Sequence, residues 1–249
     1  MNPLRLAIFA DIHSNLEALK AFMTHATKQR IDRYMCLGDI VGYGANPNEC
    51  IELVRSLPKI NIVLGNHDAA AVWISSPYTM RKEATEAILW TMDQLTDRHA
   101  ELLKNLKPTI QVQNMIFSHA NAYNPQAWRY VVDRKYAMRS FSGTREKMQF
   151  IGHSHMPLMI TRKNLFKLNF EAPKDSIPAP VSKHRRQIIN CGSIGQPRDG
   201  NPKACYSVYD TRLNKIEFHR FSYDFETAGT KIIRSGLPEF LASRLRKGR

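Results

Sequence analysis

Short apolar runs alternate with amphipathic segments through the first part of the chain, and this alternation predicts a fold class. Strands are predicted at residues 4–10, 32–37 and 60–64. Helices are predicted between them at residues 15–30 and 47–57. The first helix has one apolar side, formed by Leu16, Leu19, Phe22 and Met23. Strand, helix, strand, helix, strand is the pattern of a parallel sheet covered by helices.

The pattern turns helical after residue 69 and later returns to strands. Helices are predicted at residues 81–95 and 97–106. Strands follow at residues 109–113, 115–117, 149–151, 158–161, 165–170, 187–191, 204–210 and 215–221. Less regular parts are a long connection at 121–147, a proline-containing surface loop at 173–180, a hairpin turn at 211–214 and a helical, basic tail at 225–249. No repeat or low-complexity linker divides the chain, so we predict a single domain over residues 1–249.

Composition agrees with a folded domain that has a real core. The chain has 249 residues, of which 43% are hydrophobic and 23% charged. No apolar run approaches the length needed to cross a bilayer, and the run at residues 6–10 is too short for a signal peptide. The four cysteines show no close pairing, so we expect neither disulfides nor a thiolate zinc site. We expect a cytoplasmic protein that does not contact a membrane.

The net charge of +14 bears on the partner more than on the fold. Basic residues are spread along the chain, with a dense patch at Arg244, Arg246, Lys247 and Arg249. Such a charge suits a solvated surface, and it also attracts phosphates, nucleotides or RNA. We favour steering of an anionic substrate, with specific nucleic-acid binding as the minority hypothesis.

Side chains of the kinds that bind metals follow five of the predicted strands. The five groups are Asp11-Ile12-His13, Gly38-Asp39-Ile40-Val41-Gly42, Gly65-Asn66-His67-Asp68, Ser118-His119-Ala120 and Gly152-His153-Ser154-His155. In parallel α/β sheets, ligands gather at the carboxyl ends of the strands, so the groups are expected to converge. Any one group alone would be an ordinary loop or helix cap, but five such groups after apolar runs predict a metal site.

The donors in these groups also narrow the choice of metal. Carboxylates, imidazoles and one amide suit Mn, Fe, Zn or Mg rather than a thiolate-bound metal. In Asp11-x-His13 and His153-x-His155, an extended backbone would turn the middle residue away and let both ligands approach one site. The glycines at the strand ends permit sharp turns and close backbone approach.

The same five groups carry a resemblance to a known family. Their order, DxH, GDxxG, GNHD, a single His and GHxH over residues 11–155, resembles the calcineurin-like metallophosphoesterases. Residues 190–200 are similar to the NPGSVGQPRDG segment of small bacterial members, with Cys191 in place of proline. The resemblance implies an α/β fold: a four-layer α/β/β/α sandwich of mixed sheets with flanking helices.

Carried over to this chain, the resemblance also implies a centre of two metal ions, with Mn or Fe favoured. The first ion would be held by Asp11, His13 and His155, the second by Asn66, His119 and His153, and both by Asp39. A hydroxide shared by the ions would attack phosphorus in line. His67 would stay off the metals and protonate the leaving oxygen or stabilise its charge.

Further residues are weaker candidates, each with a structural alternative. Asp68 could orient His67 or cap the following helix, and Arg198 could bind a substrate phosphate or serve only as a hairpin residue. Asn46 is a plausible helix cap, and for Asn15 capping is favoured over steadying the Asp11 loop. A wall for base stacking could be lined by Tyr43, Trp128, Arg129 and Tyr130. For Trp128 and Tyr130, ordinary packing is the favoured interpretation.

These features favour a hydrolase of phosphate mono- or diesters that acts on a small phosphorylated substrate, with a nucleotide as one candidate. A protein Ser/Thr phosphatase and a dinucleoside polyphosphate hydrolase are alternatives within the family. Residues 69–106 could form a helical lid, which would favour small substrates. A non-catalytic scaffold that binds protein or nucleic acid is the alternative of another class, although every expected ligand position is intact. The sequence leaves the substrate and the oligomeric state open.

Overall fold

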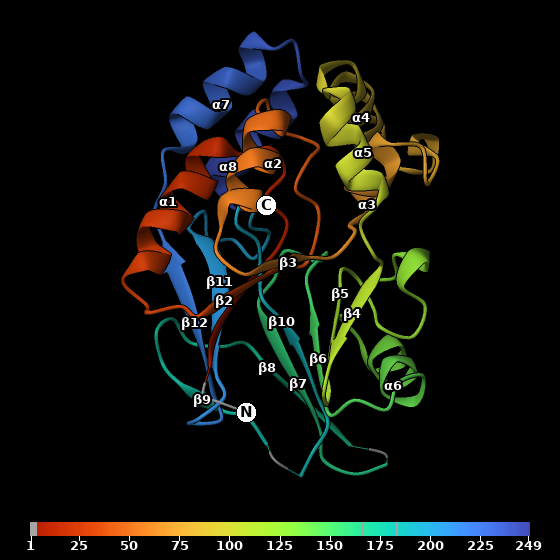
Figure 1. Ribbon diagram of the computed structural model, residues 1–249, viewed down its shortest axis with the longest axis vertical. Coiled ribbons are helices and arrows are strands. Elements are labelled where there is room, and N and C mark those ends of the chain that lie inside the picture. The colour runs from red at the N-terminus through yellow and green to blue at the C-terminus, as the bar shows by residue number, and fades with distance from the viewer. Residues whose placement is uncertain (1–3, 166, 183) are drawn as a thin grey trace.

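Two mixed sheets packed face to face, with helices on both outer sides, form the body of the protein (Figure 1). The computed structural model describes residues 4–165, 167–182 and 184–249. The layers run helix, sheet, sheet, helix, which confirms the predicted α/β/β/α sandwich.

The first sheet has the strand order β3-β2-β1-β11-β12-β9. Its strands are β1 (Arg5–Phe9), β2 (Arg33–Cys36), β3 (Ile60–Ile62), β9 (Ala179–Pro180), β11 (Ala204–Asp210) and β12 (Lys215–Phe221). The first three strands are parallel, as predicted. β11 runs antiparallel to β1, with Ile8 opposite Ser207.

The second sheet has the order β4-β5-β6-β10-β7-β8. Its strands are β4 (Thr109–Val112), β5 (Met115–Ser118), β6 (Met148–Ile151), β7 (Leu158–Arg162), β8 (Leu168–Glu171) and β10 (Gln187–Asn190). β5, β6 and β10 are parallel neighbours, while β4, β7 and β8 run antiparallel to the strands beside them.

Helices cover the two outer faces unequally. The helices are α1 (Leu16–Thr27), α2 (Pro47–Ser56), α3 (Asn66–Ala71), α4 (Lys82–Gln94), α5 (Asp97–Lys104), α6 (Arg134–Ser142), α7 (Phe225–Arg234) and α8 (Glu239–Lys247). One core joins α1, α2, α7 and α8 to the first sheet, and a smaller one joins α6 to the second (Figure 1).

The apolar face of each sheet is buried against the other sheet. Ile8 and Phe218 of the first sheet share a core with Phe117 and Phe150 of the second, and all four are at most 2% exposed. Burial of a side chain of this size contributes about 1.5–3 kcal/mol. This shared core fixes the two sheets relative to each other and so holds their carboxyl ends in one place.

A helix stands where the sequence predicts only a long connection. Within residues 121–147, α6 covers Arg134–Ser142, capped by the Asp133 side chain, which accepts from the backbone N–H of Tyr136. The prediction was wrong because α6 buries only Ala137, Ser140 and Phe141, too few apolar positions for a clear helical period. A short 3-10 helix, Pro125–Ala127, precedes it.

Several boundaries also differ from prediction. The strand predicted at 165–170 begins only at Leu168. Before it, the backbone N–H of Lys163 donates to the carbonyl of Lys167. Residue 166 lies outside the described residues. The loop predicted at 173–180 ends in β9, which pairs with β12. The side chain of Asn46 does not cap α2 but donates to Glu49. The helical tail is split into α7 and α8 around Gly236 and Pro238.

The cysteines and the helices can be compared with the expectations from composition. All four cysteines are free and buried. Within the residues that the structure describes, no helix combines the length and the apolar character needed to span a bilayer.

Candidate metal centre

The carboxyl ends of strands from both sheets meet at one point, and the five predicted groups meet there. Strands β1, β2 and β3 of the first sheet and β5 and β6 of the second each end shortly before one group. The side chains brought together are Asp11, His13, Asp39, Asn66, His67, His119, His153 and His155. Apart from Asn66, which is half-buried, all of them are buried.

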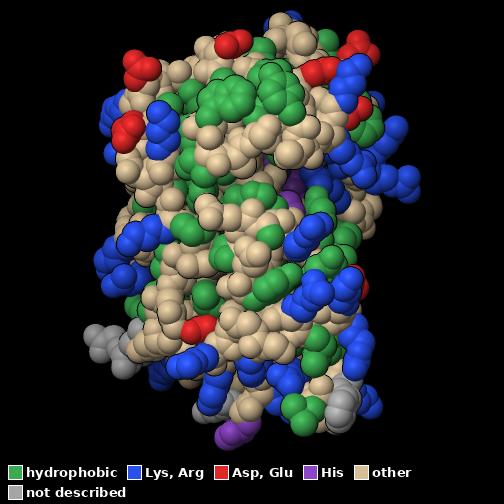
Figure 2. All heavy atoms as spheres, turned by 90° about the vertical axis from the view of Figure 1, so that its right-hand side faces the viewer, with side chains coloured by type: hydrophobic (Ala, Val, Ile, Leu, Met, Phe, Trp, Pro, Cys, Tyr) green, Lys and Arg blue, Asp and Glu red, His purple; other side chains and the backbone are tan. Residues whose placement is uncertain are grey.

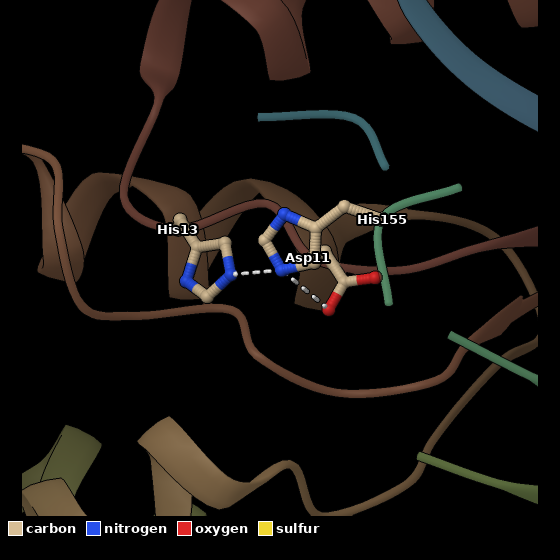
Figure 3. A group of neighbouring side chains, drawn as sticks. All are labelled: Asp11, His13 and His155. Atoms are coloured by element: carbon tan, nitrogen blue, oxygen red, sulfur yellow. Dashed lines mark hydrogen bonds and ion pairs between the residues drawn. The ribbon is translucent and has the colours of Figure 1, made fainter. Parts of the chain in front are cut away.

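Asp11, His13 and His155 form the first group (Figure 3). The Nε2 atoms of His13 and His155 lie 3.1 Å apart, and His155 Nε2 lies 3.5 Å from Asp11 Oδ1. Figure 3 shows the two rings and the carboxylate close together, with Asp11 and His13 on the loop after β1 and His155 on the loop after β6. Three donors facing a common point are an arrangement that can hold one cation.

Asp39, Asn66, His119 and His153 form the second group. His119 Nε2 lies 3.2 Å from Asp39 Oδ2, 3.0 Å from Asn66 Oδ1 and 3.1 Å from His153 Nδ1. The same Asp39 Oδ2 lies 3.7 Å from His13 Nε2 of the first group. Asp39 therefore faces both groups, as expected of a bridging carboxylate.

The outward nitrogens of the four histidines show that the centre fits metal ions. His13, His119 and His155 point Nδ1 at the carbonyl oxygens of Val41, Leu37 and Gln196, and His153 points Nε2 at that of Trp128. A carbonyl can only accept, so each outward nitrogen carries the proton and the inward nitrogen of a neutral ring is a bare acceptor. In His13 and His155, bare acceptors 3.1 Å apart repel one another unless a cation lies between them. This outward bonding is the usual support of histidine ligands.

Protonation in the centre follows burial and the two carboxylates. Burial raises the pKa of Asp11 to about 7. Burial lowers the pKa of His119, but the negative charge of Asp39 more than offsets this, and the pKa of His119 rises to about 9. Burial lowers the pKa of His153 to about 3, and the pKa values of His13 and His155 fall well below the ordinary range for the same reason. Two carboxylates with mostly neutral imidazoles are a donor set that binds divalent cations.

Five residues of the two groups have unusual backbone conformations, which direct their side chains into the centre. Asp11, His13, Asp39, His153 and His155 all have positive φ, between 51° and 66°. This region is sparsely populated by non-glycine residues, and such strain concentrates at functional sites. The expected extended backbone in Asp11-x-His13 and His153-x-His155 was therefore wrong. Each pair converges through left-handed turns instead.

Two glycines allow the Asp39 loop to approach the Gly65 turn. Gly38 has φ +88°, a conformation that suits glycine. A Cβ on Gly65 would lie 2.2 Å from both the backbone nitrogen and Oδ1 of Asp39. The expected close approach is confirmed at this pair.

Asp68 supports the loop that carries Asp39 rather than His67. Its carboxylate accepts backbone N–H bonds from Asp39, Ile40, Val41 and Gly65, at 2.8–3.1 Å. The bond from Gly65, the residue before α3, fits the capping alternative. We find no contact between its carboxylate and the His67 ring among the described residues. Asp68 acts on the centre through the position of Asp39.

We expect Asp68→Asn to loosen this loop. One amide face would oppose backbone donors, so the free energy of unfolding should fall by about 1–3 kcal/mol. Metal affinity should weaken by about 10–100-fold, as for other supports of metal ligands. Denaturant unfolding and metal titration would measure both effects, with Asp93→Asn, at an exposed position of α4, as the matched control. Equal behaviour of the two variants would contradict the role of Asp68.

His67 and Tyr43 lie beside the centre and in contact with each other. Their ring centroids are 4.4 Å apart, and each ring packs against His13. Nδ1 of His67 is buried without a hydrogen-bond partner. Burial lowers the pKa of His67 to about 4. A nitrogen of His67 also lies within 4.8 Å of donor atoms of His13 and Asp39, so the ring stands at the edge of the centre.

Arg198 faces the centre from the loop after β10. Its guanidinium donates to Gln196 Oε1 at 2.8 Å, reaches the Tyr43 hydroxyl at 3.5 Å and lies 5.8 Å from the Tyr43 ring centroid. The turn itself is held by a separate ion pair between Asp199 and Arg220. The Arg198 side chain itself contacts Gln196 and Tyr43, a position that fits the phosphate-binding alternative.

A hollow of about 820 Å³ opens over the centre. Figure 2 shows histidine at its bottom with Lys and Arg side chains along one edge. Trp128 and Tyr130 belong to its lining, and Tyr130 is 46% exposed and stacks on His153 at 4.2 Å. Both aromatics therefore pack beside the centre and also line the hollow, as the base-stacking alternative requires.

Part of the centre carries little signal in the sequence. The carbonyl oxygens that orient the histidines come from residues whose side chains reveal nothing of this role. Asn15 both caps α1 through Oδ1 and donates to Gly195 O, so the two alternatives hold together. Ser193 donates to the carbonyl of Asp11 and accepts from the backbone of Gln196. The sequence pointed to Ser193 only through the segment at residues 190–200, which resembles a segment of the family.

Comparison with known proteins agrees with this geometry. A family model described as the calcineurin-like phosphoesterase superfamily domain matches residues 4–214. An uncharacterized protein of Methanocaldococcus jannaschii is 38% identical over 248 residues, 98% of each chain. The crystal structure of a metallophosphoesterase from Sphaerobacter thermophilus matches over 100% of both chains, with 35% identity and a TM-score of 0.89. A hypothetical protein of Pyrococcus horikoshii, 21% identical over 98% of both chains, shares the fold with a TM-score of 0.79. With the family pattern confirmed in both sequence and fold, the chain belongs to the calcineurin-like phosphoesterase superfamily.

Proposed function

We propose that the protein hydrolyses a phosphate ester of a small molecule with the help of two metal ions. The observation that carries the proposal is the arrangement of seven donors in two groups, with Asp39 facing both. The superfamily depends on two metal ions, and the centre offers each of them carboxylate and imidazole donors. A site for one metal ion would require only one of the two sets of oriented histidines.

The ligand assignment follows the two groups. Asp11, His13 and His155 would hold one ion, and Asn66, His119 and His153 the other, with Asp39 shared. When bound, two such ions supply the charge that activates water and clamps phosphate oxygens. The oriented rings and the strained loops keep the donors in place before the substrate arrives, so little reorganisation is needed.

The side chains beside the centre bind the leaving oxygen and the phosphate oxygens of the substrate. His67 lies at the edge of the centre, where its neutral ring donates a hydrogen bond to the leaving oxygen. The negative charge of a bound phosphate raises the pKa of the ring and so favours proton donation to that oxygen. Arg198 places up to two N–H donors toward a phosphate oxygen, and Tyr43 keeps the guanidinium in position. No carboxylate pairs with Arg198 among the described residues, so its charge is available to an anion.

The walls of the hollow favour a small substrate over a folded phosphoprotein. Residues 75–84 form one wall, residues 127–132 a second, and Arg244 of α8 part of a third. A volume of about 820 Å³ suits a nucleotide-sized molecule. The first wall belongs to the helical segment 69–106, which supports the hypothesis that this segment acts as a lid.

A substrate screen across several metals tests the proposal. The metal-free protein, supplied in turn with Mn²⁺, Fe²⁺, Zn²⁺ or Mg²⁺, should release nitrophenol from aryl phosphate mono- or diesters and should be inactive after chelation. Nucleotides should compete, and a phosphopeptide should be a poor substrate. Absence of turnover with every metal and every ester would reject the enzyme and favour a binding scaffold. Manganese or iron as native metals and a cytoplasmic location stay predictions.

A further inference from the structure

Four arginines from separate parts of the fold line the hollow above the metal centre. They are Arg81 at the start of α4, Arg129 in the loop before α6, Arg198 after β10 and Arg244 in α8. Asp39, which faces the metal groups, is the lone carboxylate among the described lining residues. The hollow thus has far more positive charge than one phosphate group at the centre requires.

None of these arginines is neutralised by an acidic side chain among the described residues. Arg198 donates to an amide oxygen and reaches a phenol. Arg244 donates through Nε to the backbone oxygen of Arg249, and its guanidinium lies 5.3 Å from the Phe240 ring centroid. By contrast, Arg246 in the same helix pairs with Glu226, and Lys82, next to Arg81, pairs with Glu86. In each of these two neighbouring pairs, the cation that lines the hollow lacks an acidic partner within the described part of the chain, whereas its neighbour outside the hollow has one.

The arginines are close enough to repel one another. Burial lowers the pKa of Arg244, and the charges of Arg198 and Arg81 lower it further. The charge of Arg198 acts on His13 and His155 in the metal centre, whereas that of Arg244 acts on Tyr43. Arg198 contacts Tyr43, which packs on His13, so it lies beside the centre, and we call Arg81 and Arg244 the outer pair. Like charges gathered without an acidic side chain between them cost free energy, which an anion bound between them would recover.

We propose that Arg81 and Arg244 form a second anion subsite, which binds a phosphate group of the substrate beyond the one that is cleaved. The inference rests on the proposed function and specifies its substrate class: a phosphate ester with two or more phosphate groups, such as a nucleoside polyphosphate. Arg198 serves the scissile phosphate, and the outer pair serves the remaining chain. A substrate with one phosphate would leave the outer pair unused. The subsite determines specificity and takes no part in the chemistry.

Direct binding tests the subsite without relying on turnover. Inorganic tripolyphosphate and orthophosphate would be titrated calorimetrically into the full chain, with and without Mn²⁺. We expect Arg81→Gln/Arg244→Gln to weaken tripolyphosphate binding at least about tenfold, equivalent to ~1.4 kcal/mol, and to weaken orthophosphate binding much less. The matched control, Lys82→Gln/Arg246→Gln, removes the same charge from neighbouring positions outside the hollow and should bind both anions as the unmodified chain does. Equal losses in the two double variants, or equal losses for the two anions, would overturn the proposal.

Kinetics with two substrates separate a failure of the subsite from a failure of the proposed function. The ratio of kcat/KM for diadenosine tetraphosphate to kcat/KM for bis(p-nitrophenyl) phosphate should fall at least about tenfold in Arg81→Gln/Arg244→Gln. The control pair should leave the ratio unchanged. An unchanged ratio in both double variants would overturn the subsite while leaving the phosphoesterase intact. If neither ester is hydrolysed, the proposed function fails, and the calorimetry alone decides on the subsite.

Discussion

An Asp39→Ala variant is expected to lose both metal ions and at least about 10³-fold in phosphoesterase activity, since metal ions contribute several kcal/mol of transition-state stabilisation. Asp39 Oδ2 lies 3.7 Å from His13 Nε2 and 3.2 Å from His119 Nε2, so a single carboxylate serves both groups of donors. Without it, each group keeps imidazoles but loses the negative charge that they share.

Metal content and activity would be measured together, by elemental analysis and by ester hydrolysis. Asp39 also accepts a hydrogen bond from the backbone of His67, so the alanine variant could lose its fold locally. Asp39→Asn keeps an acceptor oxygen at this position and should still bind metals poorly. Circular dichroism of both variants checks the fold. Full metal occupancy in a folded Asp39→Ala protein would contradict the bridging role.

A His67→Ala variant is expected to keep both metal ions and to lose roughly 10²–10⁴-fold in turnover, the usual effect of removing a general acid. His67 belongs to the edge of the centre, where its ring packs against Tyr43 and His13 and its Nδ1 has no hydrogen-bond partner. A ring with an unpaired buried nitrogen beside the donors is suited to meet the substrate.

The leaving group separates this role from a structural one. Nitrophenolate leaves without a proton, whereas an alkoxide does not, so the loss should be large for alkyl phosphate esters and small for nitrophenyl esters. Tyr43→Phe, which keeps the ring that packs on His67, is the control and should affect both esters alike. A drop in metal content would show that His67 is a ligand. Equal losses for both esters would refute proton donation.

The gathering of these donor side chains could be predicted from the sequence because each group is a local pattern. Asp11 and His13 directly follow an apolar strand, and so do His153 and His155, so their position at a strand end needs no knowledge of distant contacts. The first three parallel strands were predictable for the same reason. The family resemblance supplied what local pattern lacks, namely the second sheet and the division of the ligands between two ions.

Features that depend on distant contacts could not be predicted. Asp68 bonds to the backbone of residues 39–41, which are adjacent only in the folded chain. The left-handed turns at Asp11 and His153 have no glycine to reveal them. Arg81 and Arg244 face one hollow from positions far apart in sequence, and nothing near Arg244 distinguishes it from Arg246. Helix α6 escaped prediction because its buried face is small.

The metal donors and the walls of the hollow come from different parts of the chain. The donors lie in the motifs at the strand ends, while the walls of the hollow come from residues 75–84, the loop before α6 and helix α8. Exchange of wall residues can therefore change substrate preference without moving a metal ligand. Variants in the walls should alter KM more than metal content.

Anomalous diffraction from crystals of the Mn²⁺-loaded protein tests the central claim most directly. Two peaks are predicted, one among Asp11, His13 and His155 and one among Asn66, His119 and His153, with Asp39 in contact with both. A single peak at full occupancy, or a peak away from these donors, would contradict a centre of two metal ions.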